Sequence, residues 1–176
     1  PQRDFVEDMK KRHNIPPPKN VPELYDLGWM TLDTPRKQLE VAIDEKVAVL
    51  ASGLGNPQFV IDTAHERGMQ VWGLVGRMRQ AKKELEAGVD VLVATGYDAG
   101  GHTGKIGTFS IIPQVASIAG DVPVLAAGGV TTGRHLAGAL TLGASGVWIG
   151  TLWLTSRESD KDMIIKEKLL AATADD

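Results

Sequence analysis

The chain alternates short apolar runs with helical stretches, and this alternation limits the fold more than any other feature of the sequence. The apolar runs are continuous, which is the pattern of parallel strands that are buried on both faces. Glycine closes most of the helical stretches, as expected of C-terminal caps. The strand starts lie roughly 20 to 35 residues apart, the separation that a strand–helix–strand unit requires. The sequence therefore predicts an α/β fold built from consecutive strand–helix units.

The expected elements can be placed by residue range. Strands are predicted at 47–50, 69–75, 89–94, 122–127 and 146–154. Helices are predicted between them at 57–67, 76–87, 110–119 and 133–142. Further helices are expected at 4–12, 34–44 and 161–172. Three consecutive prolines at 16–18 forbid helix and favour an extended linker.

Two arrangements fit five such units. One is an open doubly wound sheet, and the other is a (β/α)8 TIM barrel of which this chain holds roughly the last five strand–helix units. Periodicity does not choose between them, but glycine pairs at the ends of two consecutive strands favour the barrel. We expect one domain over 1–176, with a helical and proline-rich lead-in at 1–46, strand–helix units at 47–159 and a C-terminal helix at 160–176. The chain starts without Met inside an expected helix, so we expect it to be a piece of a longer protein.

The composition narrows the class of protein. The 176 residues include 19 Lys and Arg against 22 Asp and Glu, a net charge of −3, which gives no indication of a nucleic-acid or membrane partner. No apolar stretch approaches the ~20 residues that span a bilayer. There is no cysteine, so disulfides, thiolate metal ligands and cysteine nucleophiles are excluded, and a cytoplasmic location is expected. No two histidines have the i, i+4 spacing of helical metal ligands, so we expect no metal site.

Two predicted strands in the C-terminal half finish in backbone without bulky side chains. One ends in Gly128-Gly129 and the next leads into Gly150-Thr151. Backbone N–H groups in such a place can face an anion with no side chain in the way. In barrels of this type, the loops after the last two strands often bind phosphate. These residues therefore indicate a phosphorylated ligand.

The predicted strand at 89–94 is followed by a loop in which three glycines surround His102. Barrel enzymes place their chemistry in loops at this end of the strands. Such a loop lets a flat ring approach the backbone, and a histidine with an unperturbed pKa of about 6.5 can serve as a base near neutral pH. The alternative is a turn histidine that hydrogen-bonds its own loop. The stretch 53–55, after the first strand, either borders the substrate or forms a simple turn.

Four motifs occur in order in the chain: DAGGHTG at 98–104, AAGGV at 126–130, ALTLGA at 139–144 and VWIGT at 147–151. Together they resemble the nitronate monooxygenase family, once called 2-nitropropane dioxygenases, which also includes FMN-dependent enoyl-acyl-carrier-protein reductases. The resemblance covers about 47–159. It implies an eight-stranded barrel that binds FMN at its C-terminal mouth. It also implies a first strand with flavin contacts and a further C-terminal segment, neither of which has a counterpart in this sequence.

The resemblance further implies roles for particular residues. The implied flavin-binding set is Thr95, Gly100, Gly101, Gly128, Gly129, Trp148, Ile149, Gly150 and Thr151. Within it, Gly128-Gly129 and Gly150-Thr151 would hold the FMN phosphate, and Gly100 would lie along the flavin. His102 would be the catalytic base. Thr95 departs from the family, which usually has glutamine there as a polar flavin contact, and 71–75 lacks the lysine found in several relatives.

These roles lead to a functional hypothesis with alternatives. The leading hypothesis is FMN-dependent oxidation of alkyl nitronates and nitroalkanes by O2 to a carbonyl compound and nitrite, with His102 as base. An FMN-dependent reductase or dehydrogenase of enoyl or acyl thioesters would use the same site. A third hypothesis is an inactive or incomplete fragment that binds no flavin. The expected partner is a small molecule, a nitronate or an acyl thioester, and a homo-oligomer is compatible with the sequence.

Overall fold

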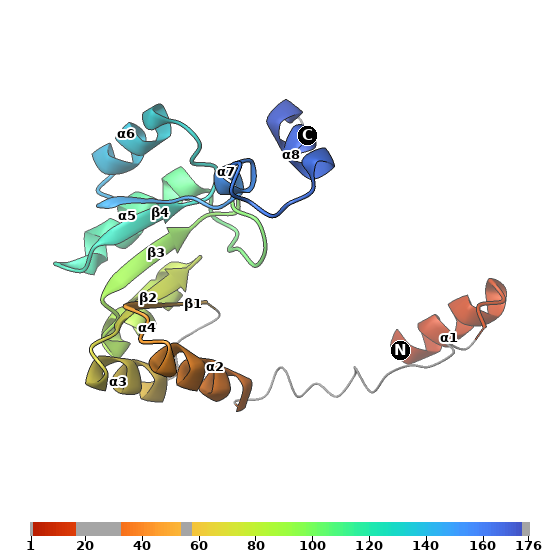
Figure 1. The fold of residues 1–176 in the computed structure, drawn as a ribbon, viewed down its shortest axis with the longest axis horizontal. Coiled ribbons are helices and arrows are strands. Elements are labelled where there is room, and N and C mark those ends of the chain that lie inside the picture. The colour runs from red at the N-terminus through yellow and green to blue at the C-terminus, as the bar shows by residue number, and fades with distance from the viewer. Residues whose placement is uncertain (1, 17–32, 54–57, 174–176) are drawn as a thin grey trace. The chain divides into compact units, whose positions relative to one another are not determined.

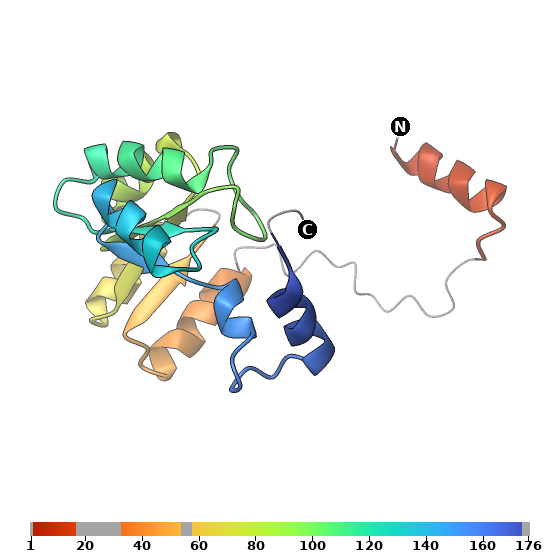
Figure 2. The same ribbon diagram turned by 90° about the horizontal axis from the view of Figure 1, so that it is seen from above.

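A computed structural model describes residues 2–16, 33–53 and 58–173 of the chain (Figures 1 and 2). These residues belong to two compact units, Pro1–Gln38 and Leu39–Asp176. Most of the expected proline linker lies outside the described residues. That the whole chain forms one domain stays a prediction.

The predicted polar helix near the N-terminus is present as α1 (Gln2–Arg12). Ion pairs one turn apart lie along it, with Lys10 2.7 Å from Glu7 and Arg12 2.6 Å from Asp8. The hydrogen bond from Lys10, together with its positive charge, lowers the pKa of Glu7. This helix is therefore held by local polar pairs on a solvated surface.

The second unit is built on one parallel sheet of five strands. The strands are β1 (Val49–Ser52), β2 (Gln70–Val75), β3 (Val91–Thr95), β4 (Val124–Ala127) and β5 (Gly146–Trp148). The remaining helices are α2 (Asp33–Asp44), α3 (Gln58–Glu66), α4 (Met78–Ala87), α5 (Thr108–Ala119), α6 (Gly133–Thr141), α7 (Thr151–Leu154) and α8 (Met163–Ala171). None of the helices in the described ranges is long and apolar enough to cross a bilayer.

The strand order distinguishes between the two predicted arrangements. A doubly wound sheet reverses its strand order at one point, so that helices cover both faces. Here the order runs from β1 to β5 without reversal, and right-handed crossovers then place every connecting helix on the same face. The contacts agree, because α3 and α4 pack on β2, α5 packs on β3 and β4, and α6 packs on β5 (Figure 1). The chain therefore forms part of a (β/α)8 barrel, as predicted.

The main core lies between the sheet and these helices. Val71, Leu92 and Ala94 of the sheet are 0% exposed, and they pack in one cluster with Ile111 and Val115 of α5. Burying a large apolar side chain contributes roughly 1.5–3 kcal/mol, so a shift of one residue in any strand would be costly. This packing fixes the register of the strands and sets all five of their C-terminal ends at one edge of the sheet.

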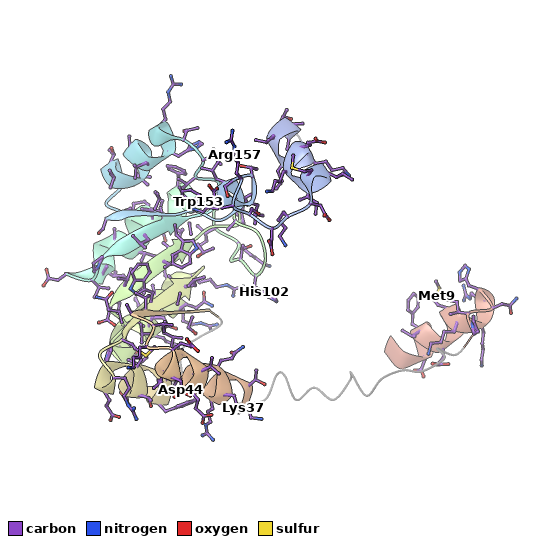
Figure 3. All side chains as sticks on the ribbon, in the orientation of Figure 1. Met9, Lys37, Asp44, His102, Trp153 and Arg157 are labelled. Atoms are coloured by element: carbon purple, nitrogen blue, oxygen red, sulfur yellow. The ribbon has the colours of Figure 1, made fainter. Side chains whose placement is uncertain are left out.

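The fifth strand is shorter than predicted. The expectation of a strand over 146–154 is wrong beyond Trp148, because β5 ends there and a short helix, α7, occupies Thr151–Leu154. Gly150 has φ −113° and ψ −73°, which turns the backbone away from the extended conformation. The apolar side chains that suggested a strand are largely exposed, and Trp153 is 63% exposed (Figure 3). A short apolar run does not by itself distinguish a strand from a helical turn.

Candidate active site

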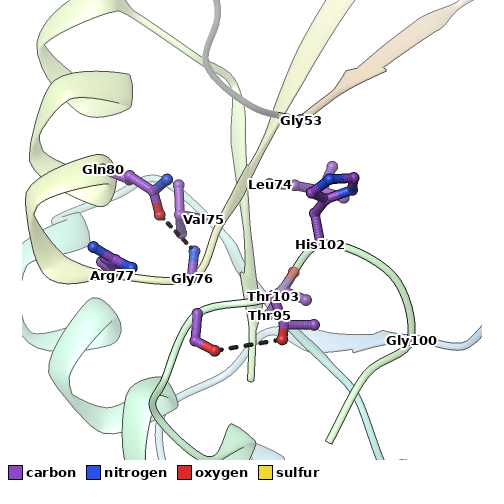
Figure 4. A pocket seen from close by; sticks show the side chains of 11 residues that line it. Gly53, Leu74, Val75, Gly76, Arg77, Gln80, Thr95, Gly100, His102 and Thr103 are labelled. Atoms are coloured by element: carbon purple, nitrogen blue, oxygen red, sulfur yellow. Dashed lines mark hydrogen bonds between the residues drawn. The ribbon is translucent and has the colours of Figure 1, made fainter. Parts of the chain in front are cut away.

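A cavity of about 390 Å³ lies at the C-terminal ends of β1, β2 and β3 (Figure 4). Three of the predicted site residues, Thr95, Gly100 and His102, line it. Gly53, at the end of β1, also lines it, and 54–57 lie outside the described residues. The fold therefore brings the predicted histidine loop and the first strand tip to one cavity.

His102 is exposed and stands in the part of the cavity that Leu74 also lines (Figure 4). Within the described residues, its imidazole makes no hydrogen bond or ion pair with the protein. Both ring nitrogens are then available to a ligand. The alternative of a turn histidine that bonds its own loop is therefore not what the described structure contains.

Close backbone contacts hold both ends of the loop that carries His102. At the start of the loop, a Cβ on Gly96 would overlap the backbone nitrogen and Oγ1 of Thr108. Near the end of the loop, Gly104 lies against Gly76, and a Cβ on Gly76 would be only 2.7 Å from the Gly104 nitrogen. Glycine is required at these positions because no side chain fits between the two backbones.

Hydrogen bonds tie the same loop to α5 and β4. Asp98 Oδ2 accepts from the Thr108 N–H at 2.6 Å, which satisfies a donor in the first turn of α5. Thr108 Oγ1 donates to the Ala127 carbonyl at 3.1 Å in the buried interior. The Tyr97 N–H donates to the Ile106 carbonyl at 3.0 Å and closes the base of the loop. The position of the histidine is thus set by contacts outside the cavity, as a preorganised site requires.

The sequence analysis missed the lining residues that come from the turn between β2 and α4. Arg77 and Gln80 both line the cavity, and Gln80 Oε1 accepts from the Gly76 N–H at 3.0 Å. In Figure 4, Arg77 and His102 lie at opposite ends of the cavity. The sequence could have indicated these residues, because polar residues that directly follow a barrel strand belong to the mouth of the barrel. Among the residues that the structure describes, no cluster of His, Asp and Glu could hold a metal ion.

The two glycines after β4, predicted to hold a phosphate, lie in close contact with the loop that carries His102. Gly128 and Gly129 have φ of 106° and 66°, a conformation that favours glycine. A Cβ on Gly128 would lie 2.7 Å from the Ala99 nitrogen, and one on Gly129 would lie 3.2 Å from the Asp98 Cβ. These glycines therefore seat the loop that carries the histidine. They also line a separate cavity of about 350 Å³, together with Asp98 and His135.

Other predicted glycines have open space in front of them. A Cβ on Gly100, Gly101 or Gly150 would meet no heavy atom within 4 Å. Ala127 of β4 pairs with Trp148 of β5, so the tips of these two strands are neighbours. The predicted phosphate residues thus lie at adjacent strand ends, with open backbone at Gly150.

The remaining predicted residues lie around the end of β5. Trp148 packs edge-on against Trp72, with ring centroids 5.9 Å apart and an interplanar angle of 66°. Ile149 is half-buried, and Thr151 is exposed at the start of α7. None of these residues lines either of the two cavities. Trp148 is therefore a packing residue in the described structure.

Comparison with protein families and curated proteins gives consistent results. A family model described as nitronate monooxygenase matches residues 10–176. The chain is 39% identical to a putative monooxygenase of Mycobacterium tuberculosis, over 99% of this chain and 47% of that protein. It is 37% identical to the (3aS,4S,5R,7aS)-5-hydroxy-7a-methyl-1-oxo-octahydro-1H-indene-4-carboxyl-CoA dehydrogenase of Rhodococcus jostii, over 79% of this chain and 39% of the relative. The chain thus spans less than half the length of these relatives.

Solved structures resemble the chain in both fold and sequence. FabK of Thermotoga maritima superposes with a TM-score of 0.76 at 36% identity, over 82% of this chain and 46% of FabK. A nitroalkane oxidase of Streptomyces ansochromogenes superposes with a TM-score of 0.70 at 31% identity, over 77% of this chain and 42% of that one.

Proposed function

The chain belongs to the nitronate monooxygenase family, and we propose that it forms part of an FMN-dependent oxidoreductase that oxidises alkyl nitronates and nitroalkanes to a carbonyl compound and nitrite. One observation supports this most: His102, without a protein partner among the described residues, lines a cavity at the C-terminal ends of the strands. The similarity to a nitroalkane oxidase supports the substrate class.

The residues present fit a flavin where the backbone is open. Because no atom blocks the Cβ positions of Gly100 and Gly101, a flat ring can approach the loop there. We assign the phosphate to Gly150 and Thr151, where the chain is exposed, and to the adjacent tip of β4 at Gly129. This proposal keeps Gly129, Gly150 and Thr151 of the predicted phosphate residues, and Trp148 and Ile149 directly precede the turn at Gly150.

Thr95 stands where the family usually has glutamine. Its hydrogen bond within the protein limits the hydrogen bonds that it can make to a ligand. Its Oγ1 donates to the Val93 carbonyl at 3.2 Å, so the oxygen offers a ligand only its lone pairs. Thr95 lines the cavity. In the proposed site it would accept one hydrogen bond from the ring, whereas a glutamine amide could both donate and accept.

The proposed chemistry begins with proton transfer to His102. The neutral imidazole removes the α-proton of a nitroalkane, and the negative charge moves onto the two nitronate oxygens. Arg77, the charged side chain among the lining residues, adds positive potential that favours the anion. Bound FMN would supply the redox chemistry, accepting electrons from the nitronate and passing them to O2. His102 then returns its proton to water.

A second candidate function uses the same cavity. The Rhodococcus dehydrogenase, by its name, acts on a CoA thioester. In this version the enzyme is an FMN-dependent reductase or dehydrogenase of acyl thioesters, and His102 exchanges a proton near the thioester carbonyl.

The two candidates differ in what reduces the flavin. Purified protein supplied with FMN is mixed, without oxygen, with propyl-2-nitronate or with NADPH, and the flavin absorbance is followed. We expect rapid bleaching by the nitronate, nitrite release once O2 is admitted, and slow bleaching by NADPH. Rapid reduction by NADPH without nitrite would favour the thioester enzyme, and a chain that binds no flavin would contradict both candidates.

The phosphate assignment predicts a selective effect at Gly150. Gly150→Asp is expected to weaken FMN binding by about tenfold or more, since a carboxylate there repels the phosphate and a tenfold loss requires only about 1.4 kcal/mol. Riboflavin has no phosphate, so its affinity should hardly change. Both affinities can be measured by quenching of flavin fluorescence, with Gly150→Asn as the uncharged control of the same size. Equal weakening of FMN and riboflavin would place the phosphate elsewhere.

A further inference from the structure

The second cavity, of about 350 Å³, is not used by the proposed chemistry at His102. Its lining includes Asp98 from the loop after β3, Phe109 from the start of α5 and His135 from the first turn of α6. Among the described residues, it shares no lining residue with the cavity that His102 lines. The loop that carries His102 borders both cavities, so the second one lies close to the mouth of the barrel.

Two polar groups of opposite hydrogen-bonding character line the second cavity. Asp98 Oδ2 accepts from the Thr108 N–H at 2.6 Å, and its other oxygen has no partner among the described residues. His135 Nδ1 accepts from the Thr131 N–H at 3.2 Å, so Nε2 carries the proton of the neutral imidazole. In the part of the chain that the structure describes, Nε2 has no protein partner either. The cavity thus offers one free acceptor and one free donor.

Asp98 and His135 line the same cavity, yet no hydrogen bond or ion pair joins them in the described structure. A carboxylate and an imidazole N–H in contact would form a short, strong hydrogen bond. Space for a ligand therefore remains between the two groups. The carboxylate disfavours a simple anion, and the imidazole N–H offers nothing to a simple cation. A ligand that satisfies both groups must itself carry a donor and an acceptor.

An aromatic ring forms another wall of this cavity. The Phe109 ring lies against α6, where a Cβ on Gly138 would be 3.1 Å from Phe109 Cε1. Its centroid is 6.1 Å from that of the His135 ring, and the two rings are tilted by 55°. Phe109 nevertheless remains 38% exposed. An exposed ring beside a few polar groups is typical of a site for a flat ligand.

We propose that the second cavity binds the adenine ring of a nicotinamide dinucleotide or of coenzyme A. Adenine carries an amino group and a ring acceptor nitrogen side by side. The amino group donates to the free oxygen of Asp98, the ring nitrogen accepts from His135 Nε2, and the flat face packs on Phe109. The proposal concerns binding, and it depends neither on flavin nor on either candidate reaction.

Adenosine and inosine are the probes. Inosine replaces the amino group by a carbonyl and the ring acceptor by an N–H, and neither nucleoside carries a phosphate. In a titration of the ¹⁵N-labelled protein, we expect adenosine to shift the amide signals of Phe109 and Ser110, which start α5 beside the cavity. Adenosine should bind about tenfold or more tightly than inosine. Equal affinities, or shifts confined to other parts of the chain, would overturn the proposal.

Competition separates this site from the flavin site and identifies the ligand. Saturating FMN should leave the affinity for adenosine unchanged, whereas displacement of adenosine by FMN would assign the cavity to the flavin and overturn the proposal. If the chain binds no flavin, adenosine should still bind, so this test is separate from that of the proposed function. NADPH and coenzyme A are then added as competitors. The tighter of the two identifies the carrier of the adenine ring, and failure of both to compete would overturn the proposal.

A variant at Asp98 tests the hydrogen bonds directly. Asp98→Asn keeps an oxygen for the Thr108 N–H and replaces the free oxygen with an NH₂ donor. We expect weaker binding of adenosine and tighter binding of inosine, so that the preference for adenosine falls about tenfold or reverses. Circular dichroism checks the fold, and His135→Phe, which removes the donor, replaces this variant if it does not fold. An unchanged preference for adenosine would contradict the assignment.

A second pair of variants tests the aromatic wall. Phe109→Ala is expected to weaken the binding of both nucleosides by about tenfold, because each base loses its stacking partner. Phe5→Ala is the matched control, since Phe5 is 65% exposed on α1 and does not line the cavity. This control should leave both affinities unchanged. Equal effects of the two variants would rule out the wall at Phe109.

Discussion

His102→Asn is expected to lower turnover of a neutral nitroalkane by about 10²–10⁴-fold and to leave turnover of the preformed nitronate within a few-fold. A nitroalkane must lose its α-proton before it can be oxidised, whereas a nitronate has already lost it. Asparagine keeps a polar side chain but removes the base. Because the imidazole has no protein partner in the described structure, the substitution breaks no contact that holds the loop.

The measurement compares nitrite release from nitroethane and from ethyl nitronate at equal FMN occupancy, which the visible spectrum reports. His65→Asn is the matched control. His65 Nε2 lies 2.8 Å from Asp90 Oδ2, its hydrogen bond there is structural, and it does not line the cavity. This control should leave both rates unchanged. If His102→Asn reduced the two rates equally, the histidine would be binding the substrate rather than removing its proton.

The sequence was sufficient to locate the five strands, apart from the end of the fifth, but not to order them. The run at 91–94 is buried at every position, so it lacks the alternation of a half-exposed strand and is recognisable as part of a parallel sheet. Strand order depends on which side of the sheet each helix packs, which no local pattern encodes. The glycine pairs favoured the barrel, and the unreversed order of the strands confirms it.

The residues of the candidate site that line the cavity could be picked out from the sequence where their signal is local. Gly100 and His102 stand in one loop, and a loop after a parallel strand leads to the mouth of a barrel. The contact between Gly76 and Gly104 joins two turns that are distant in the sequence, and each glycine by itself predicts only a turn. The error after Trp148 has another cause, because apolar residues in a short exposed helix resemble a buried strand.

Among the described residues, the glycine at the start of the histidine loop is expected to be highly sensitive to a small change. Gly96 is buried, and a Cβ there would overlap the backbone and hydroxyl of Thr108, which is itself 0% exposed. Backbone atoms cannot move aside as the end of a flexible side chain can, so Gly96→Ala should cost about 3 kcal/mol or more of the free energy of unfolding.

Gly100→Ala is the matched control for Gly96→Ala, because Gly100 lies in the same loop and a Cβ there meets nothing within 4 Å. Its free energy of unfolding should change by no more than about 0.5 kcal/mol. Urea unfolding of the flavin-free protein measures both variants, and a lower midpoint at constant slope indicates lost stability.

The displaced Thr108 also loses its hydrogen bond to Asp98, since its N–H donates to that carboxylate at 2.6 Å. Gly96→Ala should therefore increase hydrogen exchange across the His102 loop even where the protein remains folded, and Gly100→Ala should not. Similar stability and exchange in the two variants would show that the loop does not depend on this backbone contact for its position.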